Sequence, residues 1–315
     1  MPILSEKSLS SEDLGNRYDV VICALGYERR SRYVAEKLDF ESDIKIAIKF
    51  GFNEGVNYKD NKRAFEERGF EILNNSTVDL AKYLVEISEP SEEAIHVAVD
   101  ISSMSKTMMA NILSTLKVIS EKRPITITTL YAPTAYYKAR TPYPIQRSGP
   151  INSLLAGNIS GPEKPLAALV GLGNEIGLAV GAVQEIEPSL LWTFSAIGID
   201  DRFDSDIQKA NKELFSLFEL SDFQYTLTDP HTLRSDISKK IQMLKSTHRI
   251  VVVPMGPKIF SHMTIMTVLF SDDAEAAVWQ FSSGTRAEAE DREAEGAIIC
   301  HVAHVGDQKY DKRPK

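Results

Sequence analysis

The segment VAVDISSMSKTMMANILSTL, residues 97–116, has the pattern of a short apolar strand followed by an apolar helix. Five polar or charged side chains are crowded into the turn where the two patterns meet, namely Asp100, Ser102, Ser103, Ser105 and Lys106. A strand that runs through a turn into a helix is the repeating unit of parallel α/β sheets. The segment therefore predicts an α/β fold, and it raises the question of what the polar turn does.

Strand and helix patterns alternate on both sides of this segment. Apolar or β-branched runs predict strands at 20–25, 44–50, 71–73, 95–99 and 125–131, and helical spacing predicts helices at 28–38, 60–68, 78–87 and 107–120. Such alternation is typical of a doubly wound, mostly parallel sheet with helices on both faces. The Pro- and Gly-rich stretch 134–165 is expected to connect this unit to the next.

The pattern begins again after that stretch. With a shift of 147 residues, ALGYERRSRYVAEKL at 24–38 aligns with GLGNEIGLAVGAVQE at 171–185, and a gap of five more brings Lys106 opposite Lys258. The order and near-constant spacing of these matches indicate an internal duplication. The predicted fold is α/β with two similar Rossmann-like halves, residues 1–150 and 151–315, each built on a mostly parallel sheet.

The polar turn of the first half carries the parts of an anion site. Ligands of open α/β sheets bind beyond the carboxyl ends of the strands, where the strand order reverses. Hydroxyls of Ser102, Ser103 and Ser105, the first N–H groups of a helix and the charge of Lys106 would suit a phosphate or a carboxylate there. The alternative is structural: one serine caps the helix, Lys106 points to water, and Asp100 pairs with a neighbouring loop.

The turn GYERRSR, residues 26–32, follows the first of the strands predicted above. Tyr27 could stack on a base, and an arginine such as Arg29 could clamp a phosphate with two hydrogen bonds. Arginine near a helix start is unfavourable to the helix dipole, which gives a bound anion a compensating role. The alternative is a solvated face in which Glu28 pairs with a neighbouring arginine.

The segments VAVDISSMSK and ALGYERRS resemble the ligand-binding turns of CRISPR-associated Rossmann-fold sensor domains. The resemblance covers the α/β pattern of residues 18–132. Members of that family commonly bind cyclic oligonucleotides as dimers, and some cleave them, so the resemblance implies an intracellular nucleotide as ligand. Met104 stands where that family often has a glycine, and no recognisable effector domain follows. The duplicated chain could instead supply both half-sites by itself, so a homodimer and a self-sufficient chain remain alternatives.

The second half carries a Gly-rich turn instead. LVGLGNEIGLAVG, residues 169–181, has GxGxxxG spacing after an apolar strand, and Asp200 and Asp201 end the next one, a pattern similar to a dinucleotide-binding turn. Gly173, Asn174, Glu175 and Gly256 are expected to contact a base or ribose, and Lys258 is expected to keep the positive charge of the site. The alternative is tight packing of helix on strand through Gly177 and Gly181.

Composition limits the partners of the chain. A net charge of −8 argues against a broad surface for duplex nucleic acid. The two cysteines, Cys23 and Cys300, give no disulfide framework. No apolar stretch approaches the length of a membrane span or the core of a signal peptide, so we expect a cytoplasmic protein.

Two classes of function fit these patterns. The first is binding of a nucleotide or another phosphorylated small ligand, as an intracellular nucleotide sensor in antiviral defence. The second is an enzyme that hydrolyses or transfers such a substrate, with Lys106 and Arg29 stabilising charge and Asp100 or Glu28 as acid or base. No nucleophile, cofactor motif or metal set is evident, and CHVAH at 300–304 lacks a fourth metal ligand, so binding is favoured.

Overall fold

Strand pairing divides the chain into two units. The computed structural model describes residues 1–50, 55–74, 80, 83–84, 91–138, 145–157, 161–271, 275–282 and 290–306. Unit 1 comprises Met1–Ala135 together with Glu288–Lys315, and unit 2 comprises Tyr136–Ala287. The end of the chain therefore returns to the first unit, whereas the sequence placed it in the second half.

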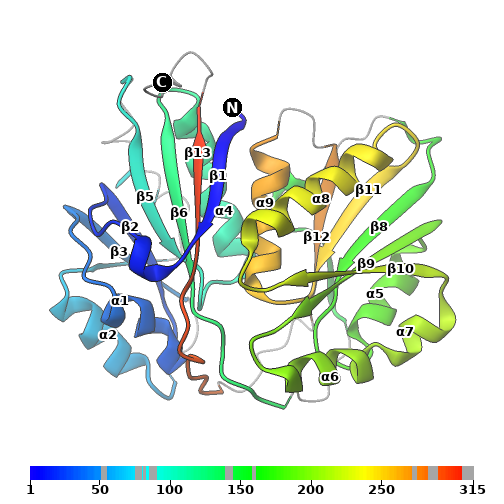
Figure 1. The fold of residues 1–315 in the computed structure, drawn as a ribbon, viewed down its shortest axis with the longest axis horizontal. Helices are drawn as coiled ribbons and strands as arrows, with labels where there is room; N and C mark the ends of the chain where they lie inside the picture. The colour runs from blue at the N-terminus through cyan, green and yellow to red at the C-terminus, as the bar shows by residue number, and fades with distance from the viewer. Residues whose placement is uncertain are drawn as a thin grey trace. The chain divides into compact units, whose positions relative to one another are not determined.

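Unit 1 is built on a seven-stranded sheet with the order β1-β13-β6-β5-β2-β3-β4 (Figure 1). Its strands are β1 Ile3–Leu9, β2 Val20–Leu25, β3 Ile44–Lys49, β4 Glu71–Asn74, β5 Ile95–Asp100, β6 Ile125–Tyr131 and β13 Ile299–Val305. The five strands from β4 to β6 run parallel. Strand β13 pairs antiparallel with β6, and β1 pairs antiparallel with β13 at the edge of the sheet. Every residue of β2 and β6 is buried, as expected of parallel strands covered on both faces.

The helices of unit 1 follow the strands as the sequence predicts. They are η2 Arg29–Arg32, α1 Tyr33–Lys37, α2 Tyr58–Glu67 and α4 Lys106–Ser120, and the 3₁₀ turn η1 Ser11–Asp13 follows β1. Helix α4 begins where Ser105 accepts a hydrogen bond from the N–H of Met108 at 3.1 Å, and its apolar residues at helical spacing are buried. Among the described residues, no helix has both the length and the apolar character that crossing a bilayer requires.

Unit 2 repeats the plan of unit 1 on a six-stranded sheet with the order β10-β9-β8-β11-β12-β7. Its strands are β7 Arg147–Pro150, β8 Leu166–Gly171, β9 Leu190–Ile197, β10 Leu220–Thr226, β11 Arg249–Pro254 and β12 Ala276–Ser282. Its helices are η3 Ser153–Leu155, α5 Leu178–Ile186, α6 Asp201–Ala210, α7 Lys212–Leu217, α8 Pro230–Leu244 and α9 Lys258–Leu269. All strands are parallel except β7, which pairs antiparallel with β12.

The two sheets have the same order when β2 to β6 are set against β8 to β12. In each sheet an antiparallel strand follows these five, β13 beside β6 and β7 beside β12. Lys106 and Lys258 are the first residues of α4 and α9, as the duplication predicts. The two Rossmann-like α/β halves with mostly parallel sheets are therefore confirmed.

The repeats exchange their sixth strands. Strand β7 follows β6 in the chain and pairs in unit 2, whereas β13 follows β12 and pairs in unit 1. Each sheet is therefore completed by the chain that follows the other sheet. This exchange explains why a boundary near residue 150 does not describe either unit.

Several local expectations differ from the structure. The helix expected over 28–38 begins as the 3₁₀ turn η2, and the connecting stretch 134–165 contains the edge strand β7, with Pro150 at its end where the missing N–H is tolerated. Most of the helix expected at 78–87 lies outside the described residues. CHVAH is part of strand β13, where the buried ring of His301 contacts Glu6 on β1 at 2.9 Å.

Candidate functional site

The strand order of unit 1 reverses between β2 and β5. From β2 the chain adds β3 and β4 on one side, and β5 and β6 lie on the other. The turns after β2 and β5 meet at this point, since a Cβ placed on Gly26 would lie 3.5 Å from the Cβ of Ser103. The structure therefore brings together the two turns of the first half that the sequence singled out, at the edge where α/β proteins bind ligands.

Asp100 and Ser102 form a buried link between β5 and the end of β6. One oxygen of Asp100 accepts hydrogen bonds from the N–H and the hydroxyl of Ser102 at 2.9 and 2.5 Å. The hydroxyl oxygen of Ser102 in turn accepts from the N–H of Ala132 at 2.8 Å. These two members of the polar turn hold the backbone. The structural alternative had Asp100 paired with a neighbouring loop, whereas Asp100 bonds Ser102 in its own turn.

The carboxyl of Asp100 lies in an environment that disfavours its charge. Its residue is 2% exposed, and this burial raises its pKa to about 6, although hydrogen bonds from Ser102 and the charge of Arg30 act in the opposite direction. Burial also raises the pKa of the neighbouring Cys23 thiol, and the charge of Asp100 adds to that effect. Asp100 is therefore a buried carboxyl whose pKa is raised toward neutral pH.

The other members of the cluster have different roles. Ser105 is the N-cap of α4, and Lys106 is the first residue of that helix, half-buried. Ser103 is 8% exposed, and its hydroxyl has no hydrogen-bond partner among the described residues. A buried hydroxyl without a partner costs about 1–3 kcal/mol, so Ser103 is the serine of the cluster whose hydrogen bonding is unsatisfied among the described residues.

The arginines of the first turn are held by different partners. Arg30 is 4% exposed, pairs with Glu28 at 2.9 Å and donates to the carbonyl of Ala132 at 3.4 Å. Arg29 is half exposed and pairs with Asp291 and Glu293. The pairing of Glu28 with an arginine, expected as the alternative, is therefore present, and it leaves Arg29 as the arginine at the surface of the turn.

Tyr27 is half-buried between these groups. Burial raises the pKa of its phenol, the carboxylate of Glu28 adds to the effect, and the charge of Arg292 opposes it. The stacking role expected of its ring stays a prediction.

A buried asparagine supports the first turn, and the sequence analysis missed it. The amide of Asn61 donates to the carbonyls of Gly26 and Glu28 at 2.9 and 2.8 Å. In unit 2 the buried Asn211 donates to the carbonyl of Gly173 at 2.9 Å. The shared signal NKxxF, at 61–65 and 211–215, marks both positions in the sequence.

The Gly-rich turn of unit 2 packs against its own backbone. A Cβ on Gly173 would lie 2.4 Å from the carbonyl oxygen of Met255, and one on Gly256 would lie 2.8 Å from the carbonyl oxygen of Leu172. The structure thus gives both glycines a packing role at the reversal point between β8 and β11. The packing alternative had named other glycines: Gly177, with φ +78°, faces open space, and a Cβ on Gly181 would lie 3.2 Å from Ile145.

The remaining candidates of unit 2 lie around the same turn. Asn174 is half-buried, with an amide nitrogen that has no partner among the described residues, and Glu175 is exposed. Asp200 caps α6 and pairs with Arg202, which stacks on the ring of Tyr136. A role for this turn in holding a base or ribose stays a prediction, as does a ligand shared by both halves.

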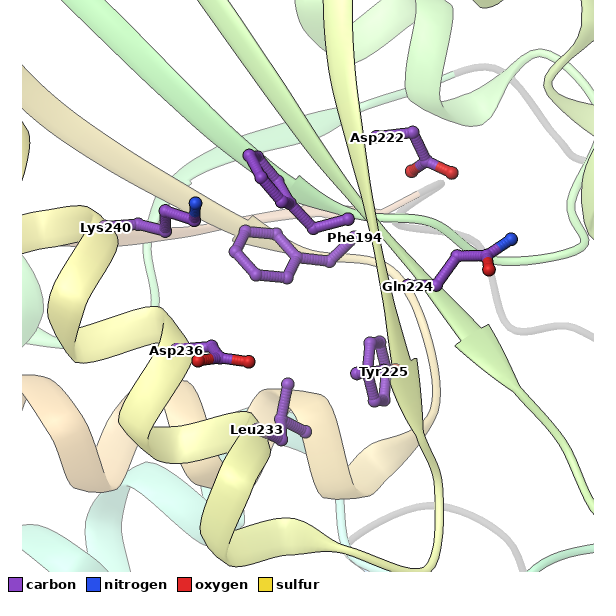
Figure 2. A pocket seen from close by; sticks show the side chains of 8 residues that line it. Phe194, Asp222, Gln224, Tyr225, Leu233, Asp236 and Lys240 are labelled. Atoms are coloured by element: carbon purple, nitrogen blue, oxygen red, sulfur yellow. The ribbon is translucent and has the colours of Figure 1, made fainter.

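A hollow of about 360 Å³ lies elsewhere in unit 2, between the edge strand β10 and helix α8 (Figure 2). Phe194, Tyr225 and Leu233 contribute apolar groups to it. Its charged groups have partners, because the ammonium of Lys240 lies 3.7 Å from the centre of the Phe223 ring and Asp236 pairs with Lys239. This hollow contains none of the residues that the sequence singled out.

Two solved structures have a distant likeness to the chain. No family profile and no curated protein sequence matches the chain. A solved structure described as a type III CRISPR defence DNA nuclease activated by cyclic oligoadenylate is similar over 86% of this chain and 67% of its own, with a TM-score of 0.48 and 11% identity. A leucoanthocyanidin reductase–NADPH complex from Vitis vinifera is similar over 83% and 92%, with a TM-score of 0.24 and 11% identity.

Replacement of Asp100 by asparagine tests the buried carboxyl. Because its pKa is raised on folding, ionised Asp100 lowers the stability of the wild-type protein as the pH rises from about 4 through 6. Asp100→Asn keeps an acceptor for Ser102 and carries no charge. The free energy of unfolding of the variant relative to wild type should therefore increase by on the order of 3 kcal/mol between pH 4 and pH 7, measured by urea unfolding. A difference that does not change with pH would contradict the assignment, and Asp39→Asn is the exposed control.

Alanine at two aligned glycines tests the difference between the two turns. Gly173→Ala should lower the free energy of unfolding by about 2 kcal/mol or more, because its methyl group meets the carbonyl oxygen of Met255 at 2.4 Å. Gly26→Ala should have a small effect, since its nearest neighbour lies at 3.5 Å. Equal losses in both variants would show that the turns pack alike.

Proposed function

We propose that unit 1 binds a nucleotide or another phosphorylated small ligand at the carboxyl ends of β2 and β5. The observation that carries this proposal is the buried hydroxyl of Ser103, which has no partner among the described residues and lies at the reversal of strand order, just before the fifteen-residue helix α4. A phosphate oxygen would accept its hydrogen bond. The positive end of the helix dipole favours an anion at the same place.

The surrounding residues would complete the site. Lys106, at the first position of α4, supplies a positive charge, and Arg29 supplies a second from the turn after β2. Tyr27 would stack on the base of a nucleotide. Ser102, Ser105 and Asp100 keep the two turns in place and would contact the ligand less directly.

We place ligand sensing ahead of turnover. The two acids suggested for catalysis are engaged, since Asp100 holds Ser102 and Glu28 holds Arg30. An intracellular sensor of cyclic oligonucleotides in antiviral defence is the form of this proposal that the resemblance of residues 97–106 supports. Mass spectrometry after incubation with a bound nucleotide separates the two classes, because a sensor leaves the nucleotide intact.

Two substitutions test the site. We expect Ser103→Ala to weaken binding about 5- to 20-fold and Lys106→Ala to weaken it by at least 10-fold, measured by calorimetry with cyclic tetra-adenylate and ATP as probes. Ser103→Ala should leave the melting temperature unchanged or slightly raised, because it removes a hydroxyl without a partner.

Two further variants serve as controls. Lys122→Ala removes an exposed lysine beyond the other end of α4 and should leave affinity unchanged. Ser102→Ala should lower the melting temperature, since its hydroxyl joins Asp100 to Ala132. If wild type binds a probe and both Ser103→Ala and Lys106→Ala bind it equally well, the ligand site lies elsewhere.

A further inference from the structure

A segment near the end of the chain, Glu290–Gly296, crosses the carboxyl edge of the first sheet; we call it the strap. Its carbonyl oxygen at Arg292 accepts from the N–H of Arg30, which follows β2. Its N–H at Glu295 donates to the carbonyl of Pro133, which follows β6, and the Tyr33 hydroxyl donates to the carbonyl of Gly296. The strap leads into β13, the dark red strand of Figure 1.

The strap and the turn beneath it have opposite charge. Residues 27–32 contain three arginines and one acid, whereas the strap contains four acids and one arginine. Burial and the charge of Glu28 are the largest causes of the raised pKa of Tyr27. The charges of Arg292 and Glu290 also act on this pKa, so Tyr27 lies close to the strap. The strap therefore covers the basic turn to which we assign part of the ligand site.

One carboxylate of the strap makes the contacts that a phosphate would make. Asp291 accepts from the main-chain N–H of Arg29 at 2.9 Å with one oxygen and from Nε of the same residue at 2.5 Å with the other. Glu293 lies 2.5 Å from the terminal nitrogen of Arg29. Burial raises the pKa of Asp291, but the hydrogen bonds and the positive charge of Arg29 act against it, and the pKa lies below its ordinary value, so Asp291 is an anion.

We propose that Asp291 fills, in the ligand-free chain, the subsite at which Arg29 binds a phosphate group of the ligand. Two oxygens of a phosphate can accept hydrogen bonds from the same main-chain N–H and guanidinium of Arg29, so ligand and strap compete for Arg29. Binding exchanges one anion for the other and releases the strap from the turn. This inference rests on the proposed function, and it adds an internal competitor that sets the affinity of the site.

The competition predicts that removing the carboxylate strengthens binding. Asp291→Asn and Asp291→Ala should each bind cyclic tetra-adenylate or ATP about 5- to 20-fold more tightly than wild type, measured by calorimetry. Glu295→Gln is the matched control, because it removes the same charge from the same strap while its side chain contacts the N–H of Ala297 and not Arg29. Its affinity should stay within about twofold of wild type.

Hydrogen exchange of the wild-type protein tests the release without any substitution. The N–H of Ala135 donates to the strap carbonyl of Glu293, and the strap N–H of Glu295 donates to the carbonyl of Pro133. Both N–H groups should exchange at least fivefold faster when the probe saturates the protein. If wild type binds a probe but the Asp291 variants bind it no more tightly and exchange does not change, the competition is wrong and the proposed function stands. If neither wild type nor any variant binds a probe, both proposals are overturned.

Discussion

The parallel pairing of β2 with β5 is the constraint on which the site depends. Val20 lies opposite Val97, and Ile22 lies opposite Val99. Because β2 continues to β3 on one side while β5 continues to β6 on the other, this pairing places two strand-to-helix turns side by side at one edge. Unit 2 has the corresponding pairing, with Ala167 opposite Ile250.

The same backbone plan carries different chemistry in the two units. In unit 1 the side chain of Ser103 lies between the two turns. Buried hydrogen bonds of Asp100 with Ser102 and of Arg30 with the carbonyl of Ala132 stabilise these turns. In unit 2 the turns approach so closely that Gly173 meets the carbonyl of Met255. The two units therefore share a strand order but differ in the polar groups at the corresponding edges.

The local part of this arrangement could be predicted from the sequence. Strands β2 and β6 and helix α4 are continuous apolar or periodic runs, and their ends are marked by polar residues such as Ser105, so the expected bounds agree with the structure within one residue. The polar turn could be located in the same way. The sequence could not predict which polar residues of the turn hold the backbone and which hydroxyl has no partner. That depends on tertiary contacts such as the hydrogen bond between Ser102 and Ala132.

Long-range features of the fold had no local signal. Arg29 and Asp291 are 262 positions apart, and their contact exists because β13 returns to the first sheet. The exchange of β7 and β13 is invisible to an alignment of the two halves, since each strand follows its own repeat in sequence. The paired asparagines did leave a signal, NKxxF, but its meaning depends on the carbonyls of Gly26 and Gly173 that they bind.

A crystal structure with a bound nucleotide tests the central claim most directly. Whichever probe binds the wild-type protein, cyclic tetra-adenylate or ATP, would be used at saturation. We predict a phosphate group within hydrogen-bond distance of the Ser103 hydroxyl, at the start of α4. A nucleotide bound in the hollow beside β10, or anywhere else with Ser103 still without a partner, would contradict this account.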